Sequence, residues 1–259
     1  MARMTLNFEG NVAVLRFNHP EVMNAVGRQM LGDLAECIAE IKRSRARALL
    51  LTGEGRAFCA GANLQDDAPA DGMRAPAGSG LRMTYNPLLI SLRELPMPMI
   101  TAVNGAAAGV GMSFALMGDI VCASKNAFFL QAFARIGLVP DGGSTFLLPR
   151  LAGWGRALEL SMLAERLPAE KAMEWGLVNR LYEDPAALMN GAMELATRLA
   201  NGPRSIALIR RLYWATWNNS YEQQLELEAQ MQDIAGASTD FAEGVTAFLE
   251  KRDARFTGA

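Results

Sequence analysis

The sequence predicts an α/β core followed by a C-terminal helical region. Strand-like and helix-like stretches alternate along the first half of the chain, and the pattern becomes almost wholly helical from residue 143 onward. Hydrophobic residues make up 51% and charged residues 20% of the 259 positions, which is ample apolar material for a folded core. We therefore expect one large domain, divided into a core over residues 1–200 and a helical region over residues 201–259.

Period-two alternation and turn residues place the strands. The first 17 residues predict two strands around the turn Glu9-Gly10-Asn11. Further strands are expected at 47–53, 98–103, 119–123, 127–131 and 177–181. Loops are expected at 19–26 and 54–64. The segment 65–80, rich in Asp, Ala, Pro and Gly, is predicted to be a mobile loop.

Apolar residues at helical spacing place the helices. Over 27–43, for example, Met30, Leu34 and Ile41 recur on one helical face. The same criterion predicts helices at 81–94, 109–117, 143–150, 155–164, 168–175, 185–200, 203–216, 221–235 and 239–251.

An uncharged stretch of 24 residues, "LPMPMITAVNGAAAGVGMSFALMG", lies between Glu94 and Asp119 and is long enough to span a bilayer. Pro96, Pro98, Asn104 and four glycines interrupt it, and its periodicity changes midway. We therefore interpret it as a buried strand, a glycine turn and a buried helix, and expect no association with a membrane.

Charge and cysteine content limit the classes of partner and compartment. The net charge of −2 gives no electrostatic reason to expect a nucleic acid as a partner. The three cysteines are widely spaced and form no C-x-x-C motif, so neither a disulfide framework nor a metal site is expected. The N-terminus lacks the apolar region of a signal peptide. These features predict a cytoplasmic protein.

Two segments of small residues could bring the backbone close to a ligand. "NGAAAGVG" (104–111) has the spacing G-x-x-x-G-x-G rather than the dinucleotide-binding G-x-G-x-x-G, and a close-packed structural turn would look the same. "AFCAGANL" (57–64) has a similar composition after a predicted strand end. Each could contribute one backbone N–H to an oxyanion hole, but the spacing leaves open whether the two segments converge.

Three further features each allow two interpretations. His19 is the only histidine and could serve a catalytic triad, yet its loop position favours an ordinary surface residue. "KRSRAR" (42–47) is either a solvated helix end or an RNA- or phosphate-binding patch. In "GLVPDGGSTF" (137–146), Asp141 is either a helix cap or a reactive carboxylate.

Motifs distributed along the whole chain resemble those of a known protein family. They are "RAFCAGANL", "PMITAVNGAAAGVG", "GDIVCAS", "ARIGLVPDGGST", "LAERLPAEKAMEWGLVNRL" and "EGVTAFLEKRDARFTG". Together they resemble the crotonase, or enoyl-CoA hydratase/isomerase, superfamily. The resemblance implies a spiral of ββα turns, C-terminal helices that form a homotrimer or a hexamer of two trimers, and an acyl-CoA thioester as substrate. No separate cofactor is expected, because coenzyme A is part of the substrate.

The resemblance also implies site residues. It places the two amides of an oxyanion hole on Ala62 and Val110. Contacts with coenzyme A or the acyl group are implied for Met23, Ala25, Ala60, Asn63, Gly109, Phe133, Leu138, Lys251 and Phe256. Of these, Lys251 and Phe256 are expected to face a neighbouring subunit's nucleotide. Phe133, Leu138 and the segment 65–90 are expected to shape the acyl pocket.

The sequence departs from the hydratases of this family at two positions. Their two catalytic glutamates fall here on Ser113 and Phe133, neither of which can act as an acid or base at neutral pH. "LVPDGGSTFLLPRLAG" instead resembles the isomerases in which a single aspartate works on the acyl chain, including those that rearrange a ring epoxide of an aryl-acetyl-CoA. We therefore predict an acyl-CoA isomerase with Asp141 as its acid/base.

Three alternatives remain at the level of sequence. The protein could be hydratase-like, or Asp141 could be a nucleophile that attacks an activated aryl-CoA. A different class of function is a non-catalytic acyl-CoA- or RNA-binding protein on the same scaffold, for which the basic run 42–47 is the only support.

Overall fold

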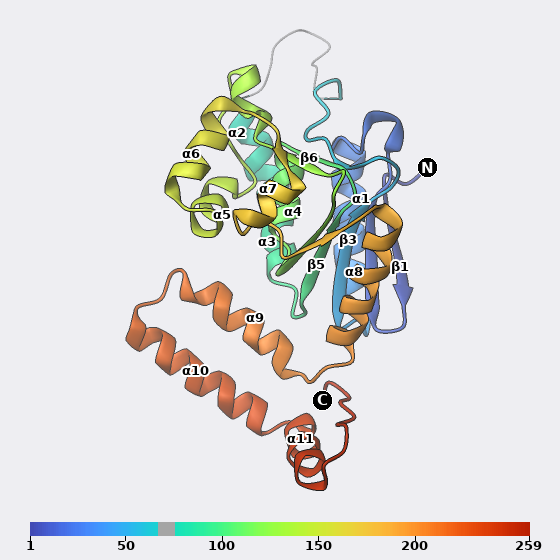
Figure 1. Ribbon diagram of the computed structural model, residues 1–259, viewed down its shortest axis with the longest axis vertical. Coiled ribbons are helices and arrows are strands. Elements are labelled where there is room, and N and C mark those ends of the chain that lie inside the picture. Colours follow the sequence, from blue (N-terminus) through green and yellow to red (C-terminus); the bar gives the residue numbers. More distant parts are fainter. Residues whose placement is uncertain (67–75) are drawn as a thin grey trace.

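Two β-sheets form the core of the protein, which a computed structural model describes over residues 1–66 and 76–259 (Figure 1). The larger sheet has the strand order β1-β2-β3-β5-β7-β10, and the smaller has the order β4-β6-β8-β9. β1 pairs antiparallel with β2, and β9 pairs antiparallel with β8, whereas all other neighbours are parallel. The strands are β1 (Met4–Glu9), β2 (Val12–Phe17), β3 (Ala48–Gly53), β4 (Ala57–Cys59), β5 (Met99–Val103), β6 (Ala106–Ala108), β7 (Ile120–Ser124), β8 (Phe128–Leu130), β9 (Leu167–Pro168) and β10 (Arg180–Tyr182).

The order of elements produces the expected spiral. β3 is followed by β4, β5 by β6 and β7 by β8, so the chain moves repeatedly from the larger sheet to the smaller one and then into a helical segment. The helices are α1 (Arg28–Arg43), α2 (Ala77–Gly80), α3 (Asn86–Arg93), α4 (Val110–Leu116), α5 (Ser144–Leu151), α6 (Trp154–Leu163), α7 (Ala169–Glu174), α8 (Pro185–Ala200), α9 (Ser205–Thr216), α10 (Tyr221–Gly236) and α11 (Thr239–Glu250). Short segments with other helical hydrogen bonding are η1 (Pro20–Val22), η2 (Leu81–Tyr85) and η3 (Ala132–Ile136).

Both faces of the larger sheet are covered. Along β3, Leu49 and Leu51 belong to the main core together with α1, whereas Leu50 packs in a second cluster with Leu188 and Ala192 of α8. Successive side chains of a strand point to opposite faces, so one strand supplies both layers. Figure 1 shows α8 lying along the sheet. Parallel strands covered on both faces explain the nearly continuous apolar runs in their sequences.

An ion pair between buried Arg210 and partly exposed Asp119 joins the C-terminal helices to the core. Arg210 of α9 donates from Nε to Asp119 Oδ2 at 2.6 Å, and Trp214 Nε1 donates to Asp119 Oδ1 at 3.0 Å. Asp119 also accepts a bond of 2.7 Å from the Met99 amide at the start of β5. Below this junction, α9, α10 and α11 extend away from the two sheets (Figure 1).

Several sequence predictions differ from the structure. The predicted loop 54–64 contains β4, and the predicted turn between β5 and α4 contains β6, because both short strands lie in segments of small residues that resemble loops. The strand expected at 177–181 begins only at Arg180. Of the predicted mobile loop 65–80, residues 67–75 lie outside the described residues, and Ala77–Gly80 is helical.

Two further predictions concern a membrane-spanning segment and the division of the chain into a core and a helical region. Within the described residues, no helix is long and apolar enough to cross a membrane. The uncharged segment forms β5, β6 and α4, as expected for a strand, a turn and a helix. The division of the chain at residue 200 stays a prediction.

An aromatic cluster supports the two elements that carry the small-residue segments. Phe17 of β2 lies 5.3 Å from Phe58 of β4 and 5.4 Å from Phe114 of α4, measured between ring centroids, in edge-to-face geometry. All three rings are almost completely buried. β4 precedes the 60–64 loop and α4 begins at Val110, so these packed rings hold both segments in place.

We expect Phe17→Ala to lower the free energy of unfolding by about 3–5 kcal/mol, because it leaves a cavity between Phe58 and Phe114. Urea denaturation followed by circular dichroism measures this change. Phe8→Ala on neighbouring β1 is the control, since Phe8 is 41% exposed. Equal losses in the two variants would contradict the role of the aromatic cluster.

Candidate active site

Asp141 lies in a glycine turn just before α5. Gly142 and Gly143 have φ angles of 61° and 81°, a backbone region that favours glycine. The main-chain carbonyl of Asp141 accepts hydrogen bonds from the Ser144 amide at 3.1 Å and from the Ser144 hydroxyl at 2.9 Å. The N-cap of α5 is Gly143, without a capping side chain. The interpretation of the Asp141 carboxylate as a helix cap is therefore wrong.

The Asp141 carboxylate is unpaired. Among the described residues, its buried Oδ1 atom has no hydrogen-bond partner. Burial raises the pKa of Asp141 from 3.8 to about 6. A carboxylate with this pKa is ionised at neutral pH and is a better base than an ordinary aspartate.

The two small-residue segments converge, a point that their spacing left open. A Cβ atom placed on Gly61 would lie 3.0 Å from the Ala108 carbonyl oxygen and 3.9 Å from Gly109 Cα. One placed on Gly109 would lie 3.8 Å from Gly61 Cα. The two backbones are thus in van der Waals contact, with φ angles of 105° at Gly61 and 53° at Gly109. A side chain at Gly61 would crowd the Ala108 carbonyl, and both φ values favour glycine.

The residues after these two glycines are Ala62 and Val110. Around Ala62, the Val26 amide donates to the Gly61 carbonyl at 2.7 Å and the Asn63 amide donates to the Val26 carbonyl at 2.9 Å. Val110 is the first residue of α4, where amides have no partner within the helix. Neither the Ala62 nor the Val110 amide donates to another residue in the described ranges. Both amides are therefore available to a ligand.

Phe133 lies against the glycine contact. It belongs to η3, is 7% exposed, and its ring atom Cζ would be 3.8 Å from a Cβ placed on Gly109. The Leu138 amide donates to the Phe133 carbonyl at 3.0 Å, which closes the η3 segment. Leu138 and Val139 are exposed. The chain between η3 and Asp141 thus presents an apolar surface.

Most of the residues that are expected to contact coenzyme A lie in two neighbouring loops. The Ala60 amide donates to the Met23 carbonyl at 3.0 Å, so the loops around Met23–Ala25 and Ala60–Asn63 lie side by side. Buried Asn24 holds this arrangement, donating to the Ala57 carbonyl at 2.8 Å and accepting from the His19 amide at 2.8 Å. Sequence reasoning missed Asn24, although an asparagine with φ of 58° is typical of a supporting turn residue.

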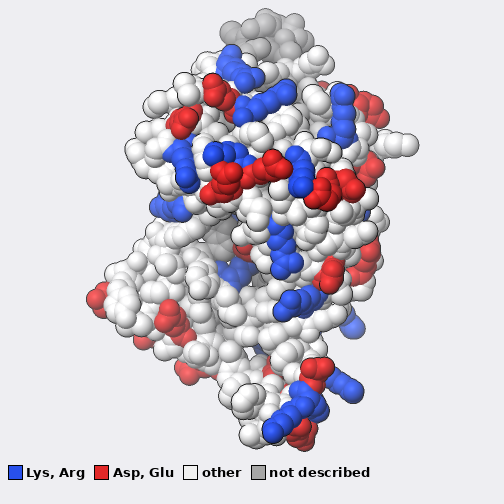
Figure 2. Space-filling model, viewed as in Figure 1, with Lys and Arg blue, Asp and Glu red and all other residues white. Residues whose placement is uncertain are grey.

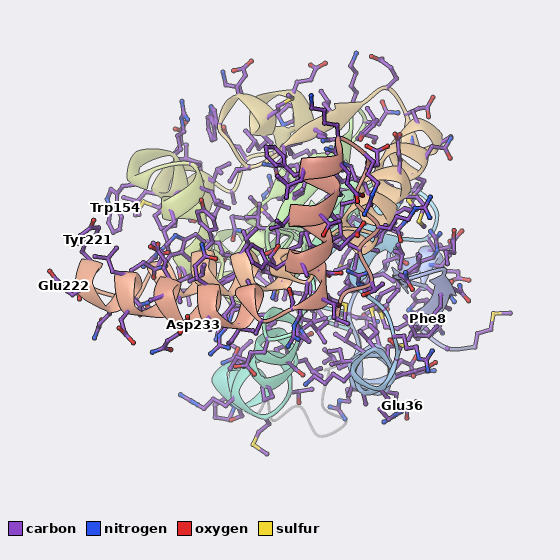
Figure 3. All side chains as sticks on the ribbon, turned by 90° about the horizontal axis from the view of Figure 1, so that it is seen from below. Phe8, Glu36, Trp154, Tyr221, Glu222 and Asp233 are labelled. Carbon is purple, nitrogen blue, oxygen red and sulfur yellow. The ribbon has the colours of Figure 1, made fainter. Side chains whose placement is uncertain are left out.

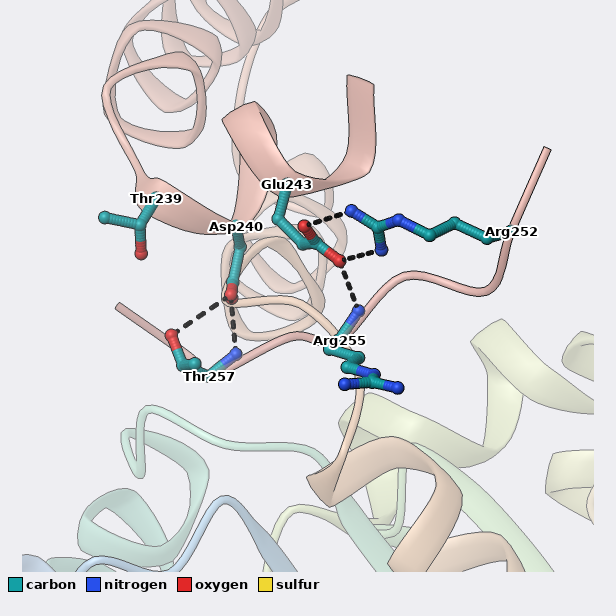
Figure 4. Close-up of a pocket in the computed structure, with 6 residues that line it drawn as sticks. All are labelled: Thr239, Asp240, Glu243, Arg252, Arg255 and Thr257. Atoms are coloured by element: carbon teal, nitrogen blue, oxygen red, sulfur yellow. Dashed lines mark hydrogen bonds and ion pairs between the residues drawn. The ribbon is translucent and has the colours of Figure 1, made fainter. Parts of the chain in front are cut away.

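Lys251 and Phe256, which are also expected to contact coenzyme A, lie in a different part of the chain. Lys251 ends α11, and Phe256 packs near Gly244 of the same helix, a region that Figure 1 separates from α4 and α5. Within one chain, neither residue joins the Asp141 region. A polar hollow of about 480 Å³ lies beside them (Figure 4). Its Asp240 accepts bonds from the Thr257, Arg204 and Gly258 amides at 2.7–2.9 Å, which tie down the C-terminal tail.

The remaining sequence candidates do not form a site. His19 precedes η1, and its Nε2 lies 4.0 Å from the Glu21 carboxylate. In the basic run, Lys42 donates to Ser91 Oγ at 2.7 Å and Arg47 donates to the Gly202 carbonyl. Acidic and basic side chains are interspersed on the face in Figure 2. Over residues 1–66 and 76–259, no group of three or more His, Cys, Asp or Glu is placed to hold a metal ion.

The family described as enoyl-CoA hydratase/isomerase matches residues 7–259. The chain belongs to this family. It is 44% identical over 253 residues to the 1,2-epoxyphenylacetyl-CoA isomerase of Escherichia coli, covering 96% of each chain. It is 42% identical over 261 residues to a protein of Rhodobacter capsulatus named as a probable enoyl-CoA hydratase, covering 100% of each.

Solved structures confirm the crotonase-like fold. The enoyl-CoA hydratase from Bacillus anthracis superposes with a TM-score of 0.92 and 29% identity, covering 99% of this chain and 100% of that one. This member of the enoyl-CoA hydratase/isomerase family therefore resembles proteins named as isomerases and proteins named as hydratases. Family membership does not decide between isomerisation and hydration. The side chains near Asp141 provide the evidence for that choice.

We expect Asp141→Asn to raise the melting temperature at about pH 7.5 and to have less effect at about pH 4. The pKa of Asp141 is higher in the folded protein than in the unfolded chain, so the folded state binds more protons between pH 3.8 and about 6. Stability contributed by this residue is therefore lost as the pH rises through that window. Scanning calorimetry of both proteins measures the effect. A stabilisation that is the same at both pH values would contradict it.

Proposed function

We propose that this protein is an acyl-CoA isomerase in which Asp141 moves a proton within a bound thioester. The unpaired Asp141 carboxylate, with its pKa raised to about 6, is the observation that carries the proposal. A base of this pKa is well matched to proton transfer near neutral pH. The backbone contact between Gly61 and Gly109 supports a substrate position beside it.

The thioester oxygen would bind between the Ala62 and Val110 amides. Negative charge that develops on this oxygen as the α-carbon loses its proton would be stabilised by both donors. Removing one such donor typically costs about 10²–10³ in rate. Coenzyme A would bind along the adjoining Met23–Ala25 and Ala60–Asn63 backbone, with Gly109, Phe133 and Leu138 near the acyl group. Lys251 and Phe256 would serve a neighbouring subunit.

Asp141 would then act as base and acid in turn. For a 3-enoyl thioester, it takes the proton from C2, the electron pair forms the 2,3 double bond as the 3,4 double bond opens, and the same carboxyl returns the proton to C4. The reaction needs no added water and regenerates the carboxylate. A single acid/base residue therefore suffices for the isomerisation.

Residues 113 and 133 favour isomerisation over hydration. Ser113 and Phe133, both buried, are the residues at which the family resemblance implies the two glutamates of hydratases. Phe133 also brings an apolar ring next to the proposed thioester site, which disfavours an activated water there. The rival role for Asp141, nucleophilic attack on an aryl-CoA, would create a covalent ester that isomerisation does not form.

Two substrate classes fit the proposal. The 44% identical relative is named for a ring-epoxide substrate, 1,2-epoxyphenylacetyl-CoA, and a linear 3-enoyl-CoA requires the same oxyanion stabilisation. We favour an aryl-acetyl or enoyl thioester accommodated against Phe133 and the exposed Leu138–Val139 surface.

We expect Asp141→Asn to lower isomerase kcat by about 10²–10⁴ while binding of a coenzyme A thioester persists, because the amide cannot accept the proton. Mass spectrometry of enoyl-CoA and aryl-acetyl-CoA substrates in deuterium oxide checks the reaction. The wild-type product should gain deuterium without the mass of water.

Asp184→Asn is the matched control, because Asp184 caps α8 through the Ala187 amide and an asparagine can do the same. It should retain full activity. Wild-type turnover in Asp141→Asn would refute the proposed role, addition of water would favour a hydratase, and a covalent adduct on Asp141 would favour the nucleophilic mechanism. Binding of RNA without turnover of any thioester would favour the non-catalytic alternative.

We propose that the C-terminal helices assemble the protein into a homotrimer or a hexamer. Large apolar side chains on α11 are exposed, including Phe248 at 82% and Leu249 at 73%. Trp154 of α6 and Tyr221 of α10 are also exposed, and both lie at the left of Figure 3. Such apolar exposure typically marks an interface.

We expect the double change Phe248→Asp and Leu249→Asp to shift the protein toward monomers, because buried charges destabilise an apolar interface. Light scattering coupled to size-exclusion chromatography measures the molar mass. Phe8→Asp, on the edge strand β1, should leave the mass unchanged. A monomeric wild-type protein would contradict the proposed assembly.

We further propose a cytoplasmic location, supported by the cysteines. Cys37, Cys59 and Cys122 are free, and burial raises the pKa of Cys59 to about 12 and that of Cys122 to about 11. Buried thiols of this kind are chemically inert and suit a reducing compartment.

A further inference from the structure

The backbone of Asp141 is held by a second serine in addition to Ser144. The Ser113 hydroxyl, on α4, donates to the Asp141 main-chain carbonyl at 2.9 Å. The Ser144 hydroxyl donates to the same oxygen at 2.9 Å, and the Ser144 amide does so at 3.1 Å. Both serine side chains are fully buried, so water does not compete for these bonds.

Ser113 links two parts of the proposed site. It lies one helical turn after Val110 on α4, and residues three apart on a helix share a face. The same face touches the glycine turn, because a Cβ placed on Gly142 would lie 3.2 Å from Val110 Cγ2 and 2.7 Å from Ser113 Cβ. The hydroxyl of Ser113 therefore joins the turn that carries Asp141 to the helix that begins with the Val110 amide.

This anchoring leaves the carboxylate itself unpaired. Hydrogen bonds to a carboxylate favour its charged form and lower its pKa, which would weaken it as a base. Bonds to the main-chain carbonyl fix the position of the residue without that effect. Glycine is also required at position 142, since a Cβ there would lie 2.7 Å from Ser113 Cβ.

We propose that Ser113 is a positioning residue, whose hydroxyl, together with that of Ser144, fixes Asp141 relative to the Val110 amide for proton transfer. The inference rests on the proposed function of Asp141. It assigns a role in isomerisation to the position at which related hydratases carry a glutamate. In this role Ser113 acts through the Asp141 main chain.

The test compares Ser113→Ala, Ser144→Ala and the double variant. Each single change removes one hydroxyl while the other remains, so we expect kcat to fall only about 3–10-fold. The double variant removes both hydroxyls, and a displaced base is expected to lower kcat by about 10² or more. The KM for the thioester should stay within about twofold in all three, because the coenzyme A contacts are unchanged.

Ser124→Ala is the matched structural control. Ser124 is also fully buried and donates to a main-chain carbonyl, that of Asn104 at 3.3 Å, but it does not contact the Asp141 turn. It should lose a similar amount of thermal stability without a change in kcat. Thioester binding by calorimetry verifies that every variant is folded.

Adding Ser113→Ala to the Asp141→Asn variant tests the positioning role of Ser113 separately from the proposed function of Asp141. If Ser113 acts through Asp141, adding Ser113→Ala to Asp141→Asn should not lower the residual rate further. A double serine variant with wild-type kcat, or a loss that appears in KM or equally in Ser124→Ala, would overturn the positioning role. Wild-type activity in Asp141→Asn alone would instead overturn the proposed function.

Discussion

The close approach of two backbones at Gly61 and Gly109 is the constraint on which the site depends. A Cβ atom on Gly61 would lie 3.0 Å from the Ala108 carbonyl oxygen, so a side chain there would strain the contact between the 60–64 loop and the segment that leads into α4. The contact leaves the Ala62 and Val110 amides free of partners within the described ranges of the chain. The larger sheet and the Phe17, Phe58 and Phe114 cluster hold the two segments from behind, so the core positions the proposed site directly.

The Asp141 turn shows how a reactive group can be rigid and unpaired at once. Its main chain is fixed by buried serine hydroxyls, and its carboxylate Oδ1 is buried with no hydrogen-bond partner in the part of the chain that the structure describes. Burial of an unpaired charge is destabilising, and this cost is typical of groups that have a chemical role. Burial of the carboxylate is the cause of its raised pKa.

Much of this architecture was predictable because it depends on local pattern. Long periodic helices such as α1, α8 and α10 match their predicted ranges within a few residues, and the family motifs led to the correct fold. The strands β4 and β6 were missed because they lie in segments of small residues that resemble loops and turns, and β9 was missed because it has only two residues. The equally short β8 lies within the predicted strand 127–131. The supporting role of Asn24 also depends on contacts between loops that are distant in sequence.

The sequence by itself determined the family, the alternation of longer strands with helices and the absence of carboxylates at positions 113 and 133. These properties depend only on residue identity and spacing. Only the tertiary structure decided that the two glycine segments meet, that Asp141 does not cap α5 through its carboxylate, and that Ser113 supports the Asp141 backbone. The physical reason is that proximity, burial and the choice of hydrogen-bond acceptor arise from packing between segments far apart in the chain.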